Sequence, residues 1–195
     1  MERYSINIPT TLTLVRLILS PLVLPVALVY LMPYNNQIIN ALLALFFLLL
    51  SLTDFFDGYL ARKYKQETTI GKALDPLADK FLFLSALIAF VTLKKIFFYW
   101  SILFIGREFF IMGLRILALE QGFDVPVSWF GKLKTVMQTL YITIAISNCH
   151  SKGLMYNYLW SDYLEYSMLA IALFFSLASA YLYYKSFMKQ FQIFH

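Results

Sequence analysis

Cysteine, histidine and charged residues are scarce in this 195-residue chain. Cys149 is the single cysteine, which excludes both an intramolecular disulfide and a thiolate metal cluster. His150 and His195 are isolated, and we assign neither a role. Charged residues make up 14% of the chain, whereas 61% is hydrophobic. This balance excludes an ordinary soluble domain and predicts a polytopic membrane protein.

Long apolar runs provide room for about six membrane-crossing helices, because a hydrocarbon core of about 30 Å needs roughly 20 helical residues. The chain shows no soluble second domain, internal repeat or low-complexity linker, so residues 1–195 are expected to form one integral membrane domain. Without a basic soluble module, nucleic acid is not an expected partner. The predicted fold is all-α, with transmembrane helices near residues 9–31, 38–62, 75–93, 96–119, 131–149 and 162–186.

The basic residues predict how these helices are oriented. With a cytoplasmic N-terminus, 13 of the 16 Lys and Arg residues fall on the cytoplasmic side, and only Lys94, Lys95 and Lys152 fall on the other. Both termini are therefore expected in the cytoplasm. Aromatic residues gather near the opposite boundary, as in membrane aromatic belts: Tyr30, Tyr34, Tyr99, Trp100, Tyr156, Tyr158, Trp160 and Tyr163.

Four of the six aspartates fall within 26 residues, directly after an apolar run. They are Asp54, Asp57, Asp75 and Asp79. Carboxylates at a membrane boundary are costly unless they are paired or bound to cations. Four carboxylates brought together cannot all ionise unaided, so we expect a divalent cation, Mg²⁺ or Mn²⁺, to neutralise them.

The residues around the first two acids suit a nucleotide diphosphate. On a helix, Asp54, Asp57, Gly58, Ala61 and Arg62 fall within an arc of about 140°. The two small residues let a nucleotide approach the helix backbone closely. The Arg62 guanidinium can clamp a diphosphate with its planar fork.

A purely structural interpretation of the acids is also available. Asp75 could cap a helix that begins at Pro76, while the other acids pair with nearby basic residues. Capping explains one acid and leaves three unexplained. Gly71 is expected in a turn between the two acid-bearing helices.

The spacing D-x2-D-G-x2-A-R-x8-G-x3-D-x3-D, which begins at Asp54 and ends at Asp79, resembles the signature of the CDP-alcohol phosphotransferases at every fixed position. The resemblance implies a homodimeric membrane enzyme with a polar cavity open to the cytoplasm, in which an alcohol attacks the β-phosphate and releases CMP. It also implies that the four acids hold two metal ions and that Asp79 is the general base. Asp57, Gly58, Ala61 and Arg62 would then bind the CDP-lipid.

Three further segments resemble the bacterial, phosphatidylglycerophosphate-forming members of that family. They are residues 7–16, 106–115 and 127–135, although Thr10 stands where those members usually have asparagine. This likeness implies transfer of a phosphatidyl group from CDP-diacylglycerol to sn-glycerol 3-phosphate in the bacterial inner membrane.

Four basic residues in two of these segments suit a phosphorylated acceptor. Arg107 and Arg115 lie 80° apart on a helix, and Lys132 and Lys134 begin the next predicted span. Together they could bind an anionic acceptor, and we expect Arg115 to contribute most. Alternatively, they follow the positive-inside rule or bind lipid headgroups. Glu108 is expected to pair with a neighbouring arginine.

Other functions compete with this one. The same chemistry could use phosphatidylglycerol, inositol phosphate or serine as acceptor, although serine would make the cationic cluster superfluous. A divalent-cation transporter would use the acids for ion passage, but it leaves the spacing of Gly58, Ala61 and Arg62 unexplained.

Overall fold

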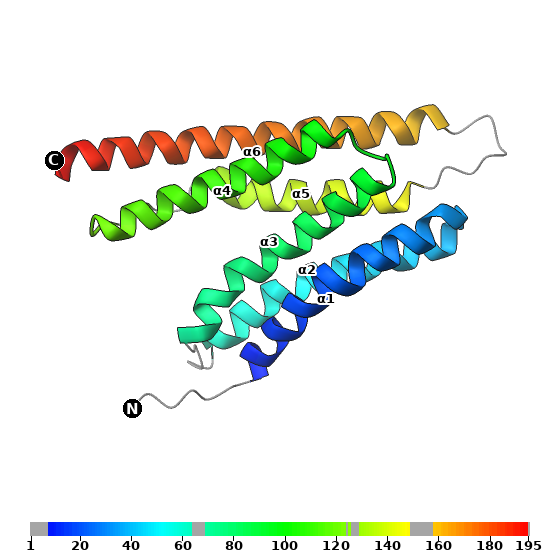
Figure 1. Cartoon of the computed structure of the whole chain (residues 1–195), viewed down its shortest axis with the longest axis horizontal. Coiled ribbons are helices and arrows are strands. Elements are labelled where there is room, and N and C mark those ends of the chain that lie inside the picture. Colours follow the sequence, from blue (N-terminus) through cyan, green and yellow to red (C-terminus); the bar gives the residue numbers. More distant parts are fainter. Residues whose placement is uncertain (1–7, 64–68, 124, 126–128, 149–157, 195) are drawn as a thin grey trace. The chain divides into compact units, whose positions relative to one another are not determined.

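The computed structural model describes residues 8–63, 69–123, 125, 129–148 and 158–194. Within its helices, the backbone alone is described for residues 8–17, 19, 54–63, 69–79, 158–159 and 193–194. These parts of the chain contain helices and no strands, which confirms the all-α prediction (Figure 1). The elements are α1 (Ile8–Leu31), the 3-10 helix η1 (Met32–Tyr34), α2 (Gln37–Lys63), α3 (Thr69–Thr92), α4 (Phe98–Glu120), α5 (Trp129–Ser147) and α6 (Tyr158–Phe194).

Each predicted span corresponds to one helix, but α3 begins before the predicted residue 75 and α6 ends after the predicted residue 186. α3 begins at Thr69, so Gly71 lies inside its first turn rather than in a turn between helices. Asp75 and Pro76 also lie inside α3, and Asp75 is therefore not its N-cap. A glycine is tolerated at the third helical position. Pro76 is the eighth helical residue, where a proline removes the hydrogen bond to the Lys72 carbonyl and crowds that carbonyl.

Helix length and composition bear on the predicted membrane spans. Within the described residues, the segment Trp160–Gln192 of α6 is long and apolar enough to cross a membrane. Shorter apolar helical segments are Ser20–Tyr34, Gln37–Thr53 and Lys80–Thr92. The whole of α6 has 37 residues and is about 55 Å long. α6 thus contains a segment that could cross a membrane, and the six-span topology stays a prediction.

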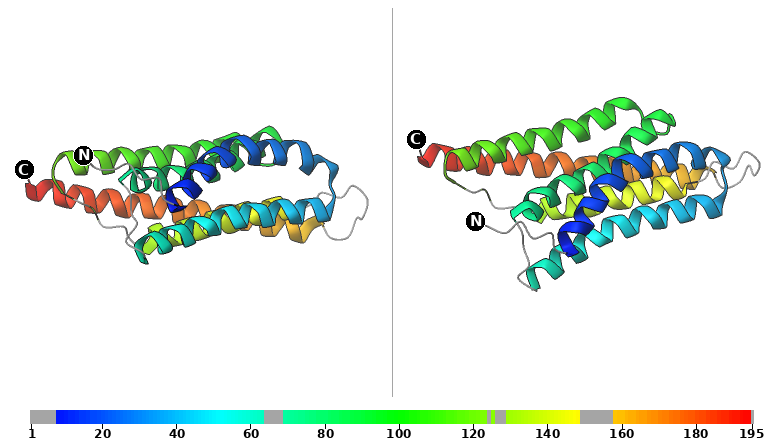
Figure 2. Two further views of the ribbon diagram at one scale, coloured as in Figure 1. Left: turned by 90° about the horizontal axis from the view of Figure 1, so that it is seen from below. Right: turned by 60° about the horizontal axis from the view of Figure 1, so that its bottom comes forward.

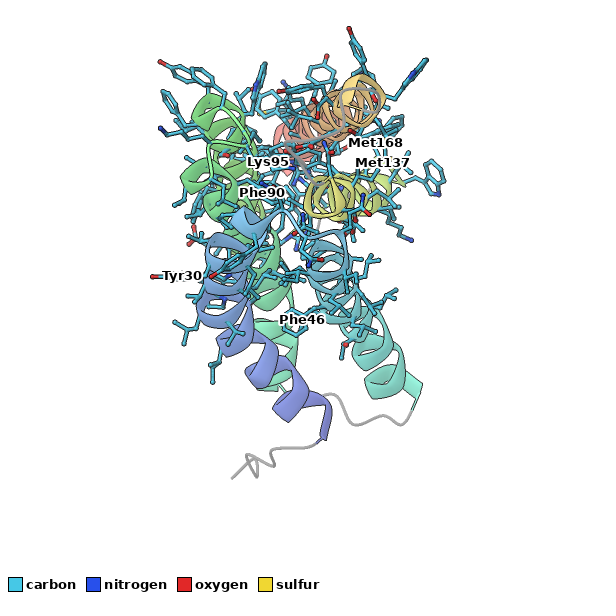
Figure 3. All side chains as sticks on the ribbon, turned by 90° about the vertical axis from the view of Figure 1, so that its right-hand side faces the viewer. Tyr30, Phe46, Phe90, Lys95, Met137 and Met168 are labelled. Atoms are coloured by element: carbon cyan, nitrogen blue, oxygen red, sulfur yellow. The ribbon has the colours of Figure 1, made fainter. Side chains whose placement is uncertain are left out.

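The chain folds into two compact units, Met1–Ile96 with Ile142–Met155, and Phe97–Tyr141 with Tyr156–His195. In the first unit, α1 packs against α3 and α2 (Figure 2). Its core includes Leu28 of α1, Phe47 of α2 and Phe90 of α3, each no more than 1% exposed. The outward side of α1 is also apolar or aromatic, and Tyr30 points away from the neighbouring helices (Figure 3).

In the second unit, α4 and α6 lie side by side and run in the same direction (Figure 1). Buried positions recur along α4 every three or four residues, the spacing of one helix face. Most are apolar, but Glu108 falls on the same face. The apolar core at the far end of this face consists of Ile111, Leu114, Ala118, Phe123, Val125, Ala180, Tyr183 and Phe187.

The C-terminus of α4 is closed by a Schellman motif. Phe123 N donates to Ala118 O, and Gly122 N donates to Leu119 O, each over 3.1 Å. Gly122 has φ +77°, in the left-handed region. Phe123 then packs against Phe187 of α6, with ring centroids 5.5 Å apart. The motif therefore turns the chain so that an aromatic side chain enters the core.

Gly122→Ala is expected to lower the apparent Tm, because a left-handed backbone costs an L-residue about 1–2 kcal/mol. An added Cβ would meet no atom within 4 Å, so backbone strain is the only expected cause. Gly113→Ala is the matched control inside α4, where the added Cβ is equally unobstructed. It should hold or raise the Tm, because alanine favours a helix interior by about 0.5–1 kcal/mol. Thermal unfolding of both variants at one scan rate is the test: the Tm should fall in Gly122→Ala and should not fall in Gly113→Ala.

Candidate active site

The backbone places the four motif aspartates near one end of the first unit. α2 and α3 are joined by residues 64–68 only, and the two helices pack together. Asp57 lies six residues before the end of α2, and Asp75 lies six residues after the start of α3. Asp54 and Asp79 lie nine and ten residues from the same ends. In helices that run in opposite directions, this spacing sets the acids at two levels, about 9 Å and 14 Å from the joined ends.

This placement fits the chemistry predicted from the sequence. Since α2 is helical through Lys63, Asp54, Asp57, Gly58, Ala61 and Arg62 share the helical geometry on which the predicted arc rests. Their side chains, like those of Asp75 and Asp79, lie outside the described set. Among the side chains that are described, no three His, Cys, Asp or Glu residues form a group that could hold a metal ion.

The second unit contains a buried ionic cluster built from three helices. On α4, Arg107 donates from Nη1 to Glu108 Oε1 over 3.0 Å. Lys134 Nζ of α5 donates to the same oxygen over 2.5 Å. From α6, Arg107 Nε meets Ser176 O at 3.1 Å and Nη2 meets Ser179 Oγ at 2.8 Å. The side chains of the three charged residues are only 7–11% exposed.

This cluster has one more positive charge than negative charge. Because both cationic nitrogens contact one oxygen, they lie no more than 5.5 Å apart, the sum of the two distances. Two positive charges at that distance repel by about 3 kcal/mol at an effective dielectric constant of 20. Glu108 offsets that repulsion and leaves a net positive charge. A buried net charge of this kind favours an anion.

The structure separates the four cations that the sequence grouped as an acceptor site. Arg107 and Lys134 enter the buried cluster, and the predicted pairing of Glu108 with an arginine is confirmed. Arg115 and Lys132 are exposed. Neither makes an ion pair with another described residue. Arg107 and Lys134 are therefore the stronger candidates for anion binding, ahead of Arg115.

The contribution of α6 was missed by sequence analysis, which assigned no functional residue to the last helix. Ser176 and Ser179 are 1% and 2% exposed and lie on the face that meets Arg107. The usable signal was a pair of serines three residues apart in an apolar helix, because residues at that spacing share one face.

Five buried polar side-chain atoms in this unit have no partner among the described residues: Ser101 Oγ, Gln138 Nε2, Ser176 Oγ, Tyr183 OH and Gln190 Oε1. Two of them lie close in sequence to the cluster residues: Ser176 Oγ belongs to the residue whose carbonyl accepts from Arg107, and Gln138 is one helical turn after Lys134. Buried polar atoms are usually hydrogen-bonded, so these two suggest that a polar molecule binds beside the cluster.

Comparison with known proteins agrees with the motif. Residues 6–181 match the sequence profile of the CDP-alcohol phosphatidyltransferases. The chain belongs to this family. Proteins named CDP-diacylglycerol–glycerol-3-phosphate 3-phosphatidyltransferase are similar to it along most of its length. That of Rickettsia typhi is 36% identical over 180 residues, covering 92% of this chain and 96% of the relative.

Two further relatives carry the same name. The Haemophilus influenzae protein is 41% identical over 138 residues, covering 69% of this chain and 72% of its own length. The Escherichia coli protein is 41% identical over 139 residues, covering 68% and 72%. The family predicted from the spacing of eight residues is thus confirmed, and the matched region contains both the aspartates and the buried cluster.

Proposed function

We propose that this CDP-alcohol phosphatidyltransferase transfers a phosphatidyl group from CDP-diacylglycerol to sn-glycerol 3-phosphate, giving phosphatidylglycerophosphate and CMP. The complete motif from Asp54 to Asp79 supports the reaction class. The observation that carries the choice of acceptor is the buried cluster of Arg107, Glu108 and Lys134, whose net positive charge suits a phosphate. The names of the similar bacterial proteins support the same acceptor.

Asp54, Asp57, Asp75 and Asp79 would hold two divalent ions, Mg²⁺ or Mn²⁺, because these ions prefer hard oxygen ligands. When bound, such ions neutralise charge that develops on the diphosphate. Asp79 accepts the proton of the attacking acceptor hydroxyl. The hydroxyl oxygen bonds to the β-phosphorus as the bond between that phosphorus and the bridging oxygen breaks, and CMP leaves with that oxygen.

The donor binds along α2 in this proposal. Gly58 and Ala61 leave space beside the helix backbone for the cytidine nucleotide. Arg62 binds the diphosphate through its guanidinium fork, and Asp57 contributes to the same CDP-lipid site. The acyl chains of the donor remain among membrane lipids.

The second unit binds the acceptor. Arg107 and Lys134 donate to its phosphate, with further attraction from Arg115 and Lys132 at the exposed ends of the site. Ser176 Oγ and Gln138 Nε2, which lack partners in the described structure, supply hydrogen bonds. A neutral acceptor such as serine would leave the net charge of this cluster uncompensated.

We place the protein in the bacterial inner membrane as a six-helix homodimer, with both termini and the polar cavity facing the cytoplasm. Large apolar side chains are exposed on several helices, including Leu22 at 63%, Phe109 at 64% and Phe174 at 64%. Soluble monomers rarely expose extensive apolar surface. In a membrane protein, lipid covers such a surface. Tyr30, Tyr34, Tyr99, Trp160 and Tyr163 are also exposed near helix ends, as an aromatic belt requires.

The two kinds of alternative function, a cation transporter and a transferase with another acceptor, stand differently. Membership of a transferase family removes the cation-transporter alternative. Phosphatidylglycerol or inositol phosphate as acceptor keeps the same reaction and would also bring a phosphate to the cationic cluster. Only direct comparison of acceptors separates these.

CMP release by the purified protein tests the proposal. The assay contains CDP-diacylglycerol and Mg²⁺, with glycerol 3-phosphate, phosphatidylglycerol, inositol phosphate or serine added in turn. Of the four acceptors, we expect only glycerol 3-phosphate to support CMP release. Chelation of Mg²⁺ should abolish this release, and restoring Mg²⁺ should recover it. Release with another acceptor would retain the chemistry and overturn the acceptor assignment. Unchanged turnover in chelator would contradict the metal-holding role of the aspartates.

A further inference from the structure

Glu108 holds two cations with one atom. Its Oε1 accepts from Arg107 Nη1 and from Lys134 Nζ, which come from different helices. The Glu108 side chain is only 7% exposed, so the carboxylate has little contact with solvent. Glu108 is therefore the link that brings Lys134 of α5 to Arg107 of α4.

The arginine is fixed independently by α6. Its Nε and Nη2 donate to Ser176 O and Ser179 Oγ, so its guanidinium plane is set even without Glu108. Lys134 has no such fork, and its ammonium ends a flexible four-carbon stem. Like charges also repel at this separation. Without the carboxylate, we expect Lys134 to move away while Arg107 stays in place.

We propose that Glu108 is a positioning residue, whose single carboxylate oxygen holds Lys134 and Arg107 within reach of one phosphate group. This inference rests on the proposed function, because it takes the cluster as the acceptor site. Glu108 itself does not bind the acceptor, since a carboxylate repels a phosphate. Its effect is on geometry: two donors placed in advance bind an anion without the cost of ordering a lysine side chain.

The test compares Glu108→Gln with the wild-type protein in steady-state kinetics. Glutamine has the same shape, but its amide oxygen is neutral and its NH₂ group cannot accept from a cation. We expect the KM for glycerol 3-phosphate to rise about tenfold or more, the loss from one misplaced charge-assisted contact. The KM for CDP-diacylglycerol should stay within about twofold, because the donor binds elsewhere. Glu120→Gln is the matched control, because Glu120 is an exposed carboxylate of the same helix.

Glu108→Asp separates geometry from charge. Aspartate retains the negative charge but is one methylene shorter, so it cannot bridge both nitrogens equally. A positioning role predicts a raised acceptor KM in this variant too, between wild type and Glu108→Gln. The Glu108→Asp variant also tests the proposal if Glu108→Gln does not fold. An unchanged or lower acceptor KM in whichever variants fold would overturn the proposal, because charge neutralisation alone would then be the role of Glu108.

A binding measurement keeps this inference distinct from the proposed function. Calorimetric titration of the full-length proteins with glycerol 3-phosphate, and separately with inorganic phosphate, needs no turnover. If wild type fails to release CMP with glycerol 3-phosphate, the proposed function is wrong. If wild type and Glu108→Gln then bind phosphate equally well, the proposed positioning role of Glu108 is wrong as well. Weaker phosphate binding by Glu108→Gln supports the positioning role in either case.

Discussion

Asp79→Asn should reduce kcat by about 1000-fold or more, while CDP-diacylglycerol binding stays within about threefold. Asparagine has nearly the same shape but cannot accept the proton of the attacking hydroxyl. Asp54, Asp57 and Asp75 remain to hold metal and donor, so binding should survive. Asp79 lies in the third turn of α3, deeper in the helix than Asp75, which suits the last acid for contact with the acceptor rather than the nucleotide.

The measurement is CMP release under saturating substrates, with donor binding titrated separately. Asp75→Asn, one turn away on the same helix, is the informative comparison. Asp75→Asn removes a metal ligand only and should weaken donor binding and lower kcat together, whereas Asp79→Asn also removes the base, so its loss of kcat should far exceed its loss of donor binding. A kcat within about tenfold of wild type for Asp79→Asn would show that another group accepts the proton.

Arg107→Met should raise the KM for glycerol 3-phosphate about 100-fold, equivalent to about 2.8 kcal/mol. The substitution removes the guanidinium and leaves Glu108 and Lys134 as a neutral pair, so the cluster no longer favours an anion. A hydrogen bond to a charged group contributes about 1.5–3 kcal/mol, and the guanidinium can make two with one phosphate. The KM for CDP-diacylglycerol should change little.

Arg115→Met provides a matched control, with the same substitution two turns along α4. Arg115 is exposed and makes no ion pair with another described residue, so we expect the acceptor KM of Arg115→Met to rise less than about tenfold. The sequence alone predicted that Arg115 contributes more to acceptor binding than Arg107. A larger effect at Arg115 than at Arg107 would mean that the acceptor binds at the exposed end of α4. Equal and small effects would show that neither arginine binds the phosphate.

The fold followed closely from apolar patterning. Six long apolar runs predicted six helices, and all six are present because each run is bounded by polar or turn-forming residues. The start of α3 was missed, because Gly71 and Pro76 are strong breaking signals in isolation. Gly71 lies in the first turn of α3, where the amide groups have no helical acceptor, so it costs little there. Pro76 is the eighth helical residue and costs α3 a backbone hydrogen bond, but it does not end the helix.

The sequence by itself determined the family and the reaction class, and it predicts that the four aspartates form the metal site. That is possible because the motif lies in two consecutive helices, where spacing along the chain fixes which residues share a turn. The buried cationic cluster could not be predicted in this way. Its residues are separated by up to 72 positions in the chain and come from three helices. Only the tertiary structure decided that Arg107 and Lys134 share Glu108, that Ser176 and Ser179 join them, and that Arg115 and Lys132 do not, because packing between helices, not spacing along one, sets those contacts.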